Sequence, residues 1–226
     1  MKDKRVVFMG TPDFSLEPLK LLIEKTNVVL EVTKKDAEVG RKRILTPSPV
    51  KKLALENNIE VFTPDSIKKE YQKVIDAKPD MIVTCAYGKI IPKELIDYPK
   101  YGCVNIHASL LPKYRGAAPI QWALINGEDI TGITLMYMDE FMDTGDIIDT
   151  AKYTINDNDN VGTLHDKLSV LGKELLDKNL ANLLTGSVSR IKQDDTKATY
   201  APMIEREMEL IDFNNNGKSI INKIRA

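Results

Sequence analysis

Two side chains able to stabilise charge and move protons lie two residues apart near the middle of the chain. Asn105 and His107 occur in the stretch Cys-Val-Asn-Ile-His, and the chain has only two histidines. An amide can donate a hydrogen bond to a developing oxyanion, and an imidazole exchanges protons near neutrality. On a β-strand both would point to the same face. We therefore expect either a catalytic pair or a hydrogen-bonded structural pair at a strand end.

A second segment, residues 139–149, carries five acidic residues and no basic one. Within it, Asp143-Thr-Gly-Asp has the composition of a turn. The functional interpretation is that Asp143 lies against His107, where it would orient the ring and stabilise its charged form. The alternative is the solvated end of a hairpin.

Two further segments have compositions that favour binding. Residues 109–119 combine two prolines, a glycine and two cations with apparently exposed leucines, which indicates either a shaped binding surface or an ordinary surface loop. Between Lys34 and Lys52 lie seven basic and two acidic residues. This cluster is either a solvated face or a contact for phosphate, such as an RNA backbone.

The elements that must position these residues alternate between strand and helix. Short apolar runs at 5–9, 28–33, 59–62, from 81 and at 102–107 predict strands, and two more are expected near 131–138 and 146–155. Helices are predicted at 66–77, 117–126 and 161–185, whereas 35–46 has no periodicity and is expected to be a loop. The pattern predicts an α/β fold with a doubly wound, mainly parallel sheet and an antiparallel C-terminal portion.

Several other site types are disfavoured. Gly10 is the only glycine in the first strand-to-helix turn, so the three-glycine dinucleotide fingerprint is missing there, and no P-loop occurs. Two cysteines and two histidines without paired spacing do not predict a metal site. His165, at the start of a predicted helix, is expected to be structural.

Composition narrows the class of protein. The 226 residues are 42% hydrophobic and 29% charged, with a formal net charge of −1. No apolar run approaches the ~18 residues that a membrane helix needs. Without a recognisable export signal we expect a cytoplasmic protein that does not associate with membranes.

Motifs spread over the whole chain resemble those of the methionyl-tRNA formyltransferase family. The matching stretches are residues 8–14, 45–51, 86–92, 105–122, 142–146 and 200–204. The Asn-x-His and Ser-Leu-Leu-Pro core alone is similar to the wider folate-dependent formyltransferases. The extension at 113–121 and the Thr-Pro-Ser-Pro-Val-Lys motif are more specific to the tRNA-directed branch.

The resemblance implies a Rossmann-like formyltransferase fold and a reaction. A formyl group would pass from 10-formyltetrahydrofolate to the amino group of methionyl initiator tRNA, by direct attack through a tetrahedral intermediate, without a metal. It implies that Asn105, His107 and Asp143 are catalytic. The residues implied to bind folate are Ser109, Leu110, Leu111, Pro112, Tyr87, Gly88, Lys89, Ile90 and Ile91. Those implied to bind the tRNA are Arg41, Lys42, Arg43 and Arg115.

The resemblance also sets expectations for domains and partners. Residues 1–190 would form the catalytic domain, and 191–226 an extension that begins the linker to a β-barrel domain absent from this sequence. We therefore expect weakened tRNA binding, and a monomer. The basic loop is less glycine-rich than is usual in the family. The alternatives are transfer to an amino sugar nucleotide or to glycinamide ribonucleotide, hydrolysis of formyl-folate, and a non-catalytic folate- or RNA-binding module.

Overall fold

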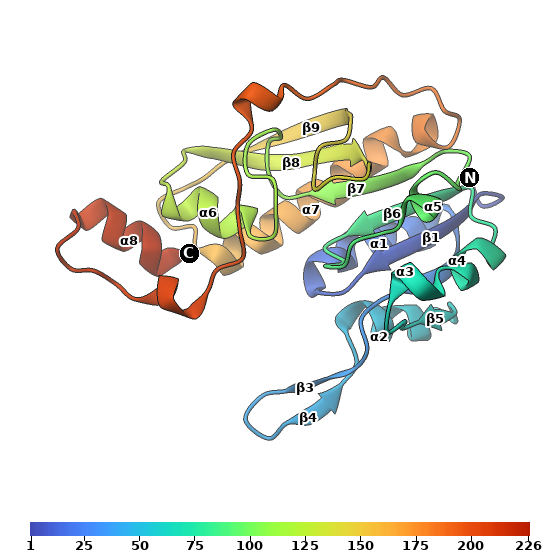
Figure 1. The fold of residues 1–226 in the computed structure, drawn as a ribbon, viewed down its shortest axis with the longest axis horizontal. Coiled ribbons are helices and arrows are strands. Elements are labelled where there is room, and N and C mark those ends of the chain that lie inside the picture. Colours follow the sequence, from blue (N-terminus) through green and yellow to red (C-terminus); the bar gives the residue numbers. More distant parts are fainter.

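A seven-stranded sheet forms the centre of the computed structural model, which describes all 226 residues (Figure 1). The strand order is β5-β2-β1-β6-β7-β8-β9; the first five strands are parallel, and β8 and β9 are antiparallel. This confirms the predicted fold class. The strands are β1 Arg5–Gly10, β2 Asn27–Val32, β5 Val61–Phe62, β6 Met81–Cys85, β7 Cys103–His107, β8 Ile130–Tyr137 and β9 Ile147–Thr154.

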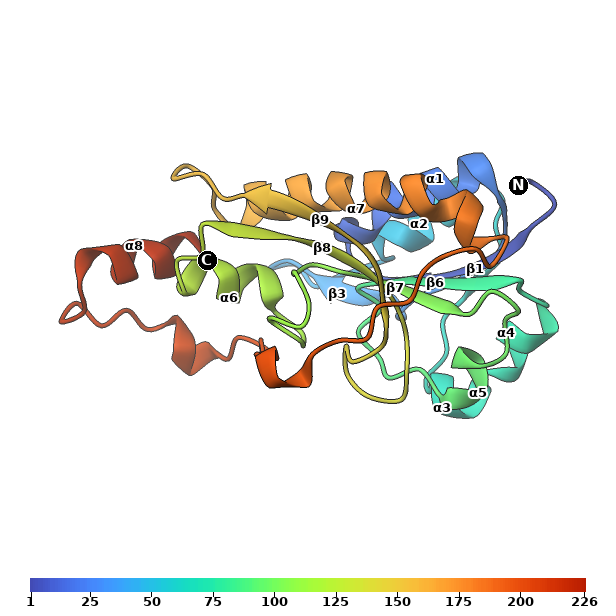
Figure 2. The same ribbon diagram turned by 90° about the horizontal axis from the view of Figure 1, so that it is seen from above.

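Helices cover both faces of the sheet (Figure 2). One face carries α1 Leu16–Lys25, α2 Pro49–Glu56 and α7 Val161–Leu183, and the other carries α3 Ile67–Glu70, α4 Gln72–Asp76 and α5 Lys93–Ile96. Two more, α6 Pro119–Ile125 and α8 Gly217–Arg225, pack together beside the antiparallel strands. Single 3₁₀ turns occur at Asp13–Ser15, Asp195–Lys197 and Arg206–Glu209. No helix is both long and apolar enough to cross a membrane.

The long helix α7 begins and ends where its sequence dictates. At its start the Asn160 side chain accepts a hydrogen bond from the Thr163 amide, and the Thr163 hydroxyl accepts one from the Asn160 amide, both at 3.0 Å. These bonds satisfy amides that the first helical turn leaves without partners. Gly186, with a φ of +74°, follows the last turn. Because its leucines are buried against the sheet, α7 packs over β8 and β9.

Two local predictions are wrong. Residues 35–46 are not a loop: β3 Ala37–Val39 and β4 Ile44–Thr46 pair as an antiparallel hairpin that projects from the body (Figure 1). Its strands are exposed on both faces, so no alternation of apolar and polar residues marks them. The helix predicted at 66–77 forms as the two short helices α3 and α4, separated at Tyr71.

Candidate active site

Strand β7 places Asn105 and His107 on the same face of the sheet. Val104 and Ile106 belong to the core beneath α7, so the two polar side chains between and after them point the other way. Asn105 pairs in register with Thr84 of β6, whose hydroxyl donates a 2.7 Å hydrogen bond to Asn105 Oδ1. This bond turns the Asn105 Nδ2 group outward, where it is free to donate to a ligand.

The two nitrogens of His107 have different partners. The ring is buried, and Nε2 lies 2.9 Å from the Tyr114 carbonyl oxygen. Since a carbonyl only accepts, Nε2 carries a hydrogen. Nδ1 lies 3.7 Å from Asp143 Oδ2. Nδ1 is therefore the nitrogen whose lone pair is free, and it lies beside a carboxylate.

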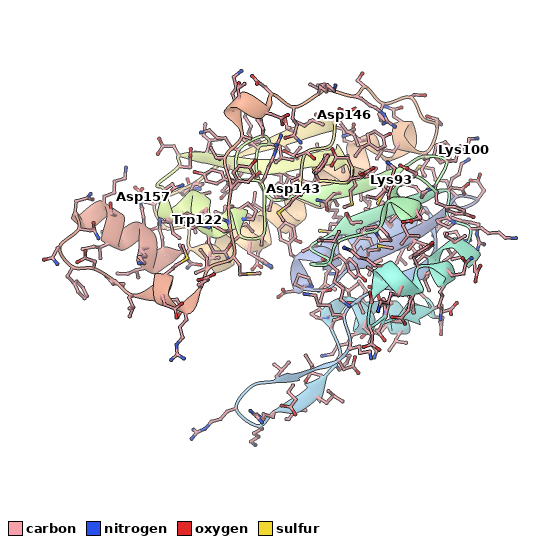
Figure 3. The ribbon with its side chains drawn as sticks, in the orientation of Figure 1. Lys93, Lys100, Trp122, Asp143, Asp146 and Asp157 are labelled. Carbon is pink, nitrogen blue, oxygen red and sulfur yellow. The ribbon has the colours of Figure 1, made fainter.

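Asp143 lies in the turn between β8 and β9 and reaches the loop that follows β7. Its Oδ2 accepts a 2.8 Å hydrogen bond from the Gly116 amide. Its φ of +56° is in the left-handed region, which non-glycine residues rarely adopt. Two residues later, a Cβ on Gly145 would lie 1.9 Å from the Tyr137 carbonyl oxygen, so only glycine fits there. Asp143, labelled in Figure 3, thus lies beside His107, and Asn105 lies two residues before His107 on the same strand.

The loop containing Ser109 to Pro112 is tied to the sheet by Thr134 of β8. The Thr134 hydroxyl donates to the Ser109 carbonyl at 2.6 Å and accepts from the Leu111 amide at 3.0 Å. The Ser109 hydroxyl itself donates to the Lys113 carbonyl at 2.6 Å. Ser109 and Leu111 are buried, whereas Leu110 and Pro112 are half-buried. The loop therefore has a fixed shape, and Leu110 and Pro112 are the members that reach its surface.

Arg115 has a different setting from the one that the resemblance implied. Its side chain is only 3% exposed, and its guanidinium donates to Gln193 Oε1 and to Asp195 Oδ1. Its charge is therefore paired inside the protein and is not presented on an open surface.

The residues from Tyr87 to Ile91 follow β6 at the same end of the sheet. Tyr87 and Ile91 are buried, while Gly88 and Ile90 are exposed. The Tyr87 hydroxyl has no hydrogen-bond partner, and burial, with the negative charges of Glu31 and Glu70, raises its pKa to about 12. The Lys89 ammonium donates to the Pro64 and Asp65 carbonyls, which anchors the segment to a neighbouring loop.

A cavity of about 290 Å³ lies between α5 and the residues after β8. Its lining residues are Lys93, Ile96, Asp97, Met138, Asp139, Glu140 and Phe141. Thr84, which orients Asn105, also lies 3.4 Å from Met138 Sδ, so the cavity is next to the catalytic candidates. None of these lining residues was predicted to bind a substrate, although three of them belong to the acidic segment 139–149. The sequence feature that could have indicated this cavity is Phe141, an aromatic residue inside the acidic segment that leads to Asp143.

The predicted tRNA contacts Arg41, Lys42 and Arg43 lie at the tip of the β3–β4 hairpin, and all three are exposed. Arg43 has an acidic neighbour in Glu38 at 3.6 Å. Arg41 and Lys42 form no ion pair, so their charges are available to a ligand.

His165, the second histidine, contacts Phe14, Asp13 and Asp166 and none of the candidate catalytic residues. Its ring packs edge-on against Phe14 with centroids 5.3 Å apart, and its Nδ1 lies 2.9 Å from Asp166 Oδ1. The contact with Phe14 joins the start of α7 to the 3₁₀ turn after β1. The structure contains no group of three or more His, Cys, Asp or Glu side chains that could hold a metal ion.

Comparison with known proteins identifies the family. Residues 4–180 match the Formyl transferase family. The methionyl-tRNA formyltransferase of Bacillus subtilis (strain 168) is 53% identical over 225 residues, which are 98% of this chain and 71% of that protein. The chain belongs to the methionyl-tRNA formyltransferase family.

Solved structures of other formyltransferases share its fold. WlaRD, a sugar 3N-formyl transferase determined with dTDP and 5-N-formyl-THF, is 25% identical with a TM-score of 0.73, covering all of this chain and 79% of that one. A 4-N formyltransferase from Francisella tularensis is 23% identical with a TM-score of 0.77. The match covers 100% of this chain and 88% of the Francisella chain. In this member of the methionyl-tRNA formyltransferase family, residues after 180 also support the site, because Gln193 and the 199–201 segment contact its loops.

Proposed function

We propose that this chain transfers a formyl group from 10-formyltetrahydrofolate to the amino group of methionyl initiator tRNA. The substrate class follows from its methionyl-tRNA formyltransferase relatives. The observation that carries the chemistry is the meeting of Asn105, His107 and Asp143, with His107 Nδ1 3.7 Å from Asp143 Oδ2.

These three residues can perform the transfer without a covalent enzyme intermediate. As the amine attacks the formyl carbon, a new C–N bond forms and the formyl oxygen becomes an oxyanion. Asn105 Nδ2 donates a hydrogen bond to that oxygen, a contact whose loss in other enzymes costs ~10²–10³ in rate. His107 Nδ1 takes a proton from the attacking nitrogen and returns it to the departing folate nitrogen, so that protons balance when the old C–N bond breaks. The Asp143 carboxylate stabilises the imidazolium formed between the two steps.

The cavity would hold the ring system of the folate but not the whole molecule. Its volume of about 290 Å³ is just below the range of about 300–1,000 Å³ for small-molecule sites. Ile96, Met138 and Phe141 would contact the flat ring, and the Asp139 and Glu140 carboxylates would accept from its N–H groups. The exposed parts of the 87–91 and 109–112 segments flank the catalytic residues and would contact the remainder.

The β3–β4 hairpin would contact the phosphates of the tRNA acceptor end. Its tip presents Arg41 and Lys42 without acidic partners, which suits phosphate binding. Arg115 would contribute indirectly, by shaping the loop that carries it. Since the chain spans 71% of the length of its B. subtilis relative, we expect these 226 residues alone to bind tRNA more weakly than a full-length relative. Monomeric state and cytoplasmic location stay predictions.

An acceptor comparison tests the proposal. The chain is incubated with 10-formyltetrahydrofolate and, separately, methionyl initiator tRNA, a dTDP-linked amino sugar or glycinamide ribonucleotide. We expect formylation of the methionyl-tRNA only. Formylation of either small acceptor, or release of free formate without any acceptor, would contradict the proposal. Folate or RNA binding with no single-turnover transfer would identify a binding module instead.

A further inference from the structure

We infer that Gln193 is a positioning residue for formyl transfer: its side-chain amide fixes the turn that holds Asp143 against His107. The inference rests on the proposed function. Gln193 lies 50 residues after Asp143, in the segment between α7 and α8. Figure 1 shows this segment returning past the antiparallel strands toward α8.

The Gln193 amide uses all of its hydrogen-bonding capacity within the protein. Nε2 donates to the Asp143 carbonyl oxygen at 2.9 Å and to the Gly145 carbonyl oxygen at 2.8 Å. Oε1 accepts from Arg115 Nε at 3.2 Å and from Arg115 Nη2 at 2.8 Å. Two donors and two acceptor positions are thereby satisfied, so nothing remains for a substrate. The role open to this side chain is to hold other residues.

Arg115 anchors the other end of this contact. The buried guanidinium cannot move without leaving a charge unpaired inside the protein. Its backbone is also fixed, because its amide donates to the Thr199 carbonyl at 2.9 Å and its carbonyl accepts from the Ala201 amide at 2.7 Å. Gln193 therefore connects the Asp143 turn to a rigid part of the loop that follows β7.

The Asp143 turn requires such a support. A non-glycine residue at positive φ costs roughly 1–3 kcal/mol and persists only where its surroundings enforce it. The carboxylate lies between the Gly116 amide and His107 Nδ1, so a small rotation of the turn would separate it from the imidazole. The two bonds from Gln193 Nε2 hold the backbone carbonyls on both sides of Thr144. Loss of these bonds should misplace the Asp143 carboxylate without removing it.

Two substitutions separate this role from simple stabilisation. Gln193→Met keeps the length and removes all four hydrogen bonds. Gln193→Glu keeps acceptors for Arg115, but places an oxygen against the Asp143 and Gly145 carbonyls, so the Arg115 contact survives while the turn is released. The matched control is Asp194→Asn. Asp194 directly follows Gln193, and its side chain contacts only Thr196 and Lys197.

We expect both Gln193 variants to lower kcat by roughly 10- to 100-fold, the scale for a misplaced catalytic group. The Kd for a folate analogue and the KM for methionyl-tRNA should stay within threefold, because Gln193 touches neither proposed binding surface. Asp194→Asn should retain kcat within twofold. Thermal melts establish that each variant is folded at the assay temperature.

A spectroscopic readout independent of activity completes the test. With only two histidines, ¹⁵N imidazole spectra resolve His107 and His165 separately. Both Gln193 variants should move the His107 Nδ1 signal and leave His165 unchanged. An unmoved His107 signal in the folded Gln193→Glu variant, or a kcat like that of the unsubstituted chain, would overturn the inference. If the unsubstituted chain formylates nothing, the proposed function fails, and the histidine spectra still decide whether Gln193 positions Asp143.

Discussion

The candidate active site and the β3–β4 hairpin differ in how firmly they are packed. His107 is 6% exposed, and hydrogen bonds of Thr134, Gly116, Gln193 and Arg115 join the loops around it. In the hairpin, by contrast, the side chains of Val39, Ile44 and Leu45 are more than half exposed. The hairpin is held mainly by its own backbone pairing, with the Arg43–Glu38 ion pair beside its turn. Both regions contain several charged residues, but only the first is packed.

This difference matches two kinds of recognition. Transfer of a one-carbon group requires donors and a carboxylate fixed before the substrate arrives, since preorganised groups need not reorient in the transition state. Contact with a phosphate backbone requires charge within reach, and does not require one exact geometry. Substitutions in the two regions should therefore differ in which kinetic or stability parameter they change.

The largest expected effect is at the buried site. His107→Ala removes the proposed proton carrier, and should lower the single-turnover rate of formyl transfer by about 10³-fold. Binding of a folate analogue, measured by fluorescence, should remain within threefold, because His107 does not line the cavity. His165→Gln is the matched control and should keep normal turnover. Normal transfer by the His107→Ala variant would refute the assignment.

The next effect concerns Glu31, which is fully buried in β2, the strand that leads to the hairpin. Both its carboxyl oxygens lack hydrogen-bond partners, and burial raises the pKa of Glu31 to about 9, against the weaker opposing effect of Lys51. The folded state therefore keeps a proton that the unfolded state loses above pH 4.5. Its stability should fall as pH rises from 4.5 to about 9.

Glu31→Leu should remove this dependence and raise the free energy of unfolding by about 3 kcal/mol at pH 7. Urea unfolding at several pH values measures both changes. Glu38→Leu, in the exposed strand β3, is the control and should change neither. The same slope of stability with pH in the Glu31→Leu protein would show that Glu31 is not the titrating group.

Local patterns in the sequence predicted much of the fold, and they singled out Asn105, His107 and the Asp143 turn as candidates for one site. The alternation around Val104 and Ile106 placed Asn105 and His107 on one face, and the leucine spacing at 161–185 defined α7. The hairpin was not predicted, because its strands bury neither face and the sequence therefore has no alternation of apolar and polar residues there.

The parts that could not be predicted depend on contacts between distant residues. Nothing near Arg115 in the sequence indicates that its guanidinium is buried against Gln193, 78 positions away. The cavity likewise combines α5 with the residues after β8. Neither pairing has a local periodicity or spacing that would reveal it, because both arise only when the sheet has formed.

A smaller effect is expected at the hairpin tip. Replacing Arg41 and Lys42 together by Gln should raise the KM for methionyl-tRNA about tenfold and reduce the slope of log affinity against log salt by about 1–2. The kcat and the Kd for a folate analogue should not change. The control with equal charge loss is Lys68→Gln with Lys69→Gln, on exposed positions of α3. An equal rise in KM in both double variants would mean that overall charge, and not the hairpin, attracts the tRNA.

The smallest effect should come from the apolar side chains of the hairpin. Val39 is 57% exposed, whereas Val7 of β1 is fully buried. Val39→Ala should change the free energy of unfolding by less than about 0.5 kcal/mol, as at other exposed positions. Val7→Ala leaves a cavity in the core and should cost about 2 kcal/mol. Urea unfolding of both variants measures the contrast, and a loss for Val39→Ala comparable to that for Val7→Ala would show that the hairpin packs against another part of the chain in solution.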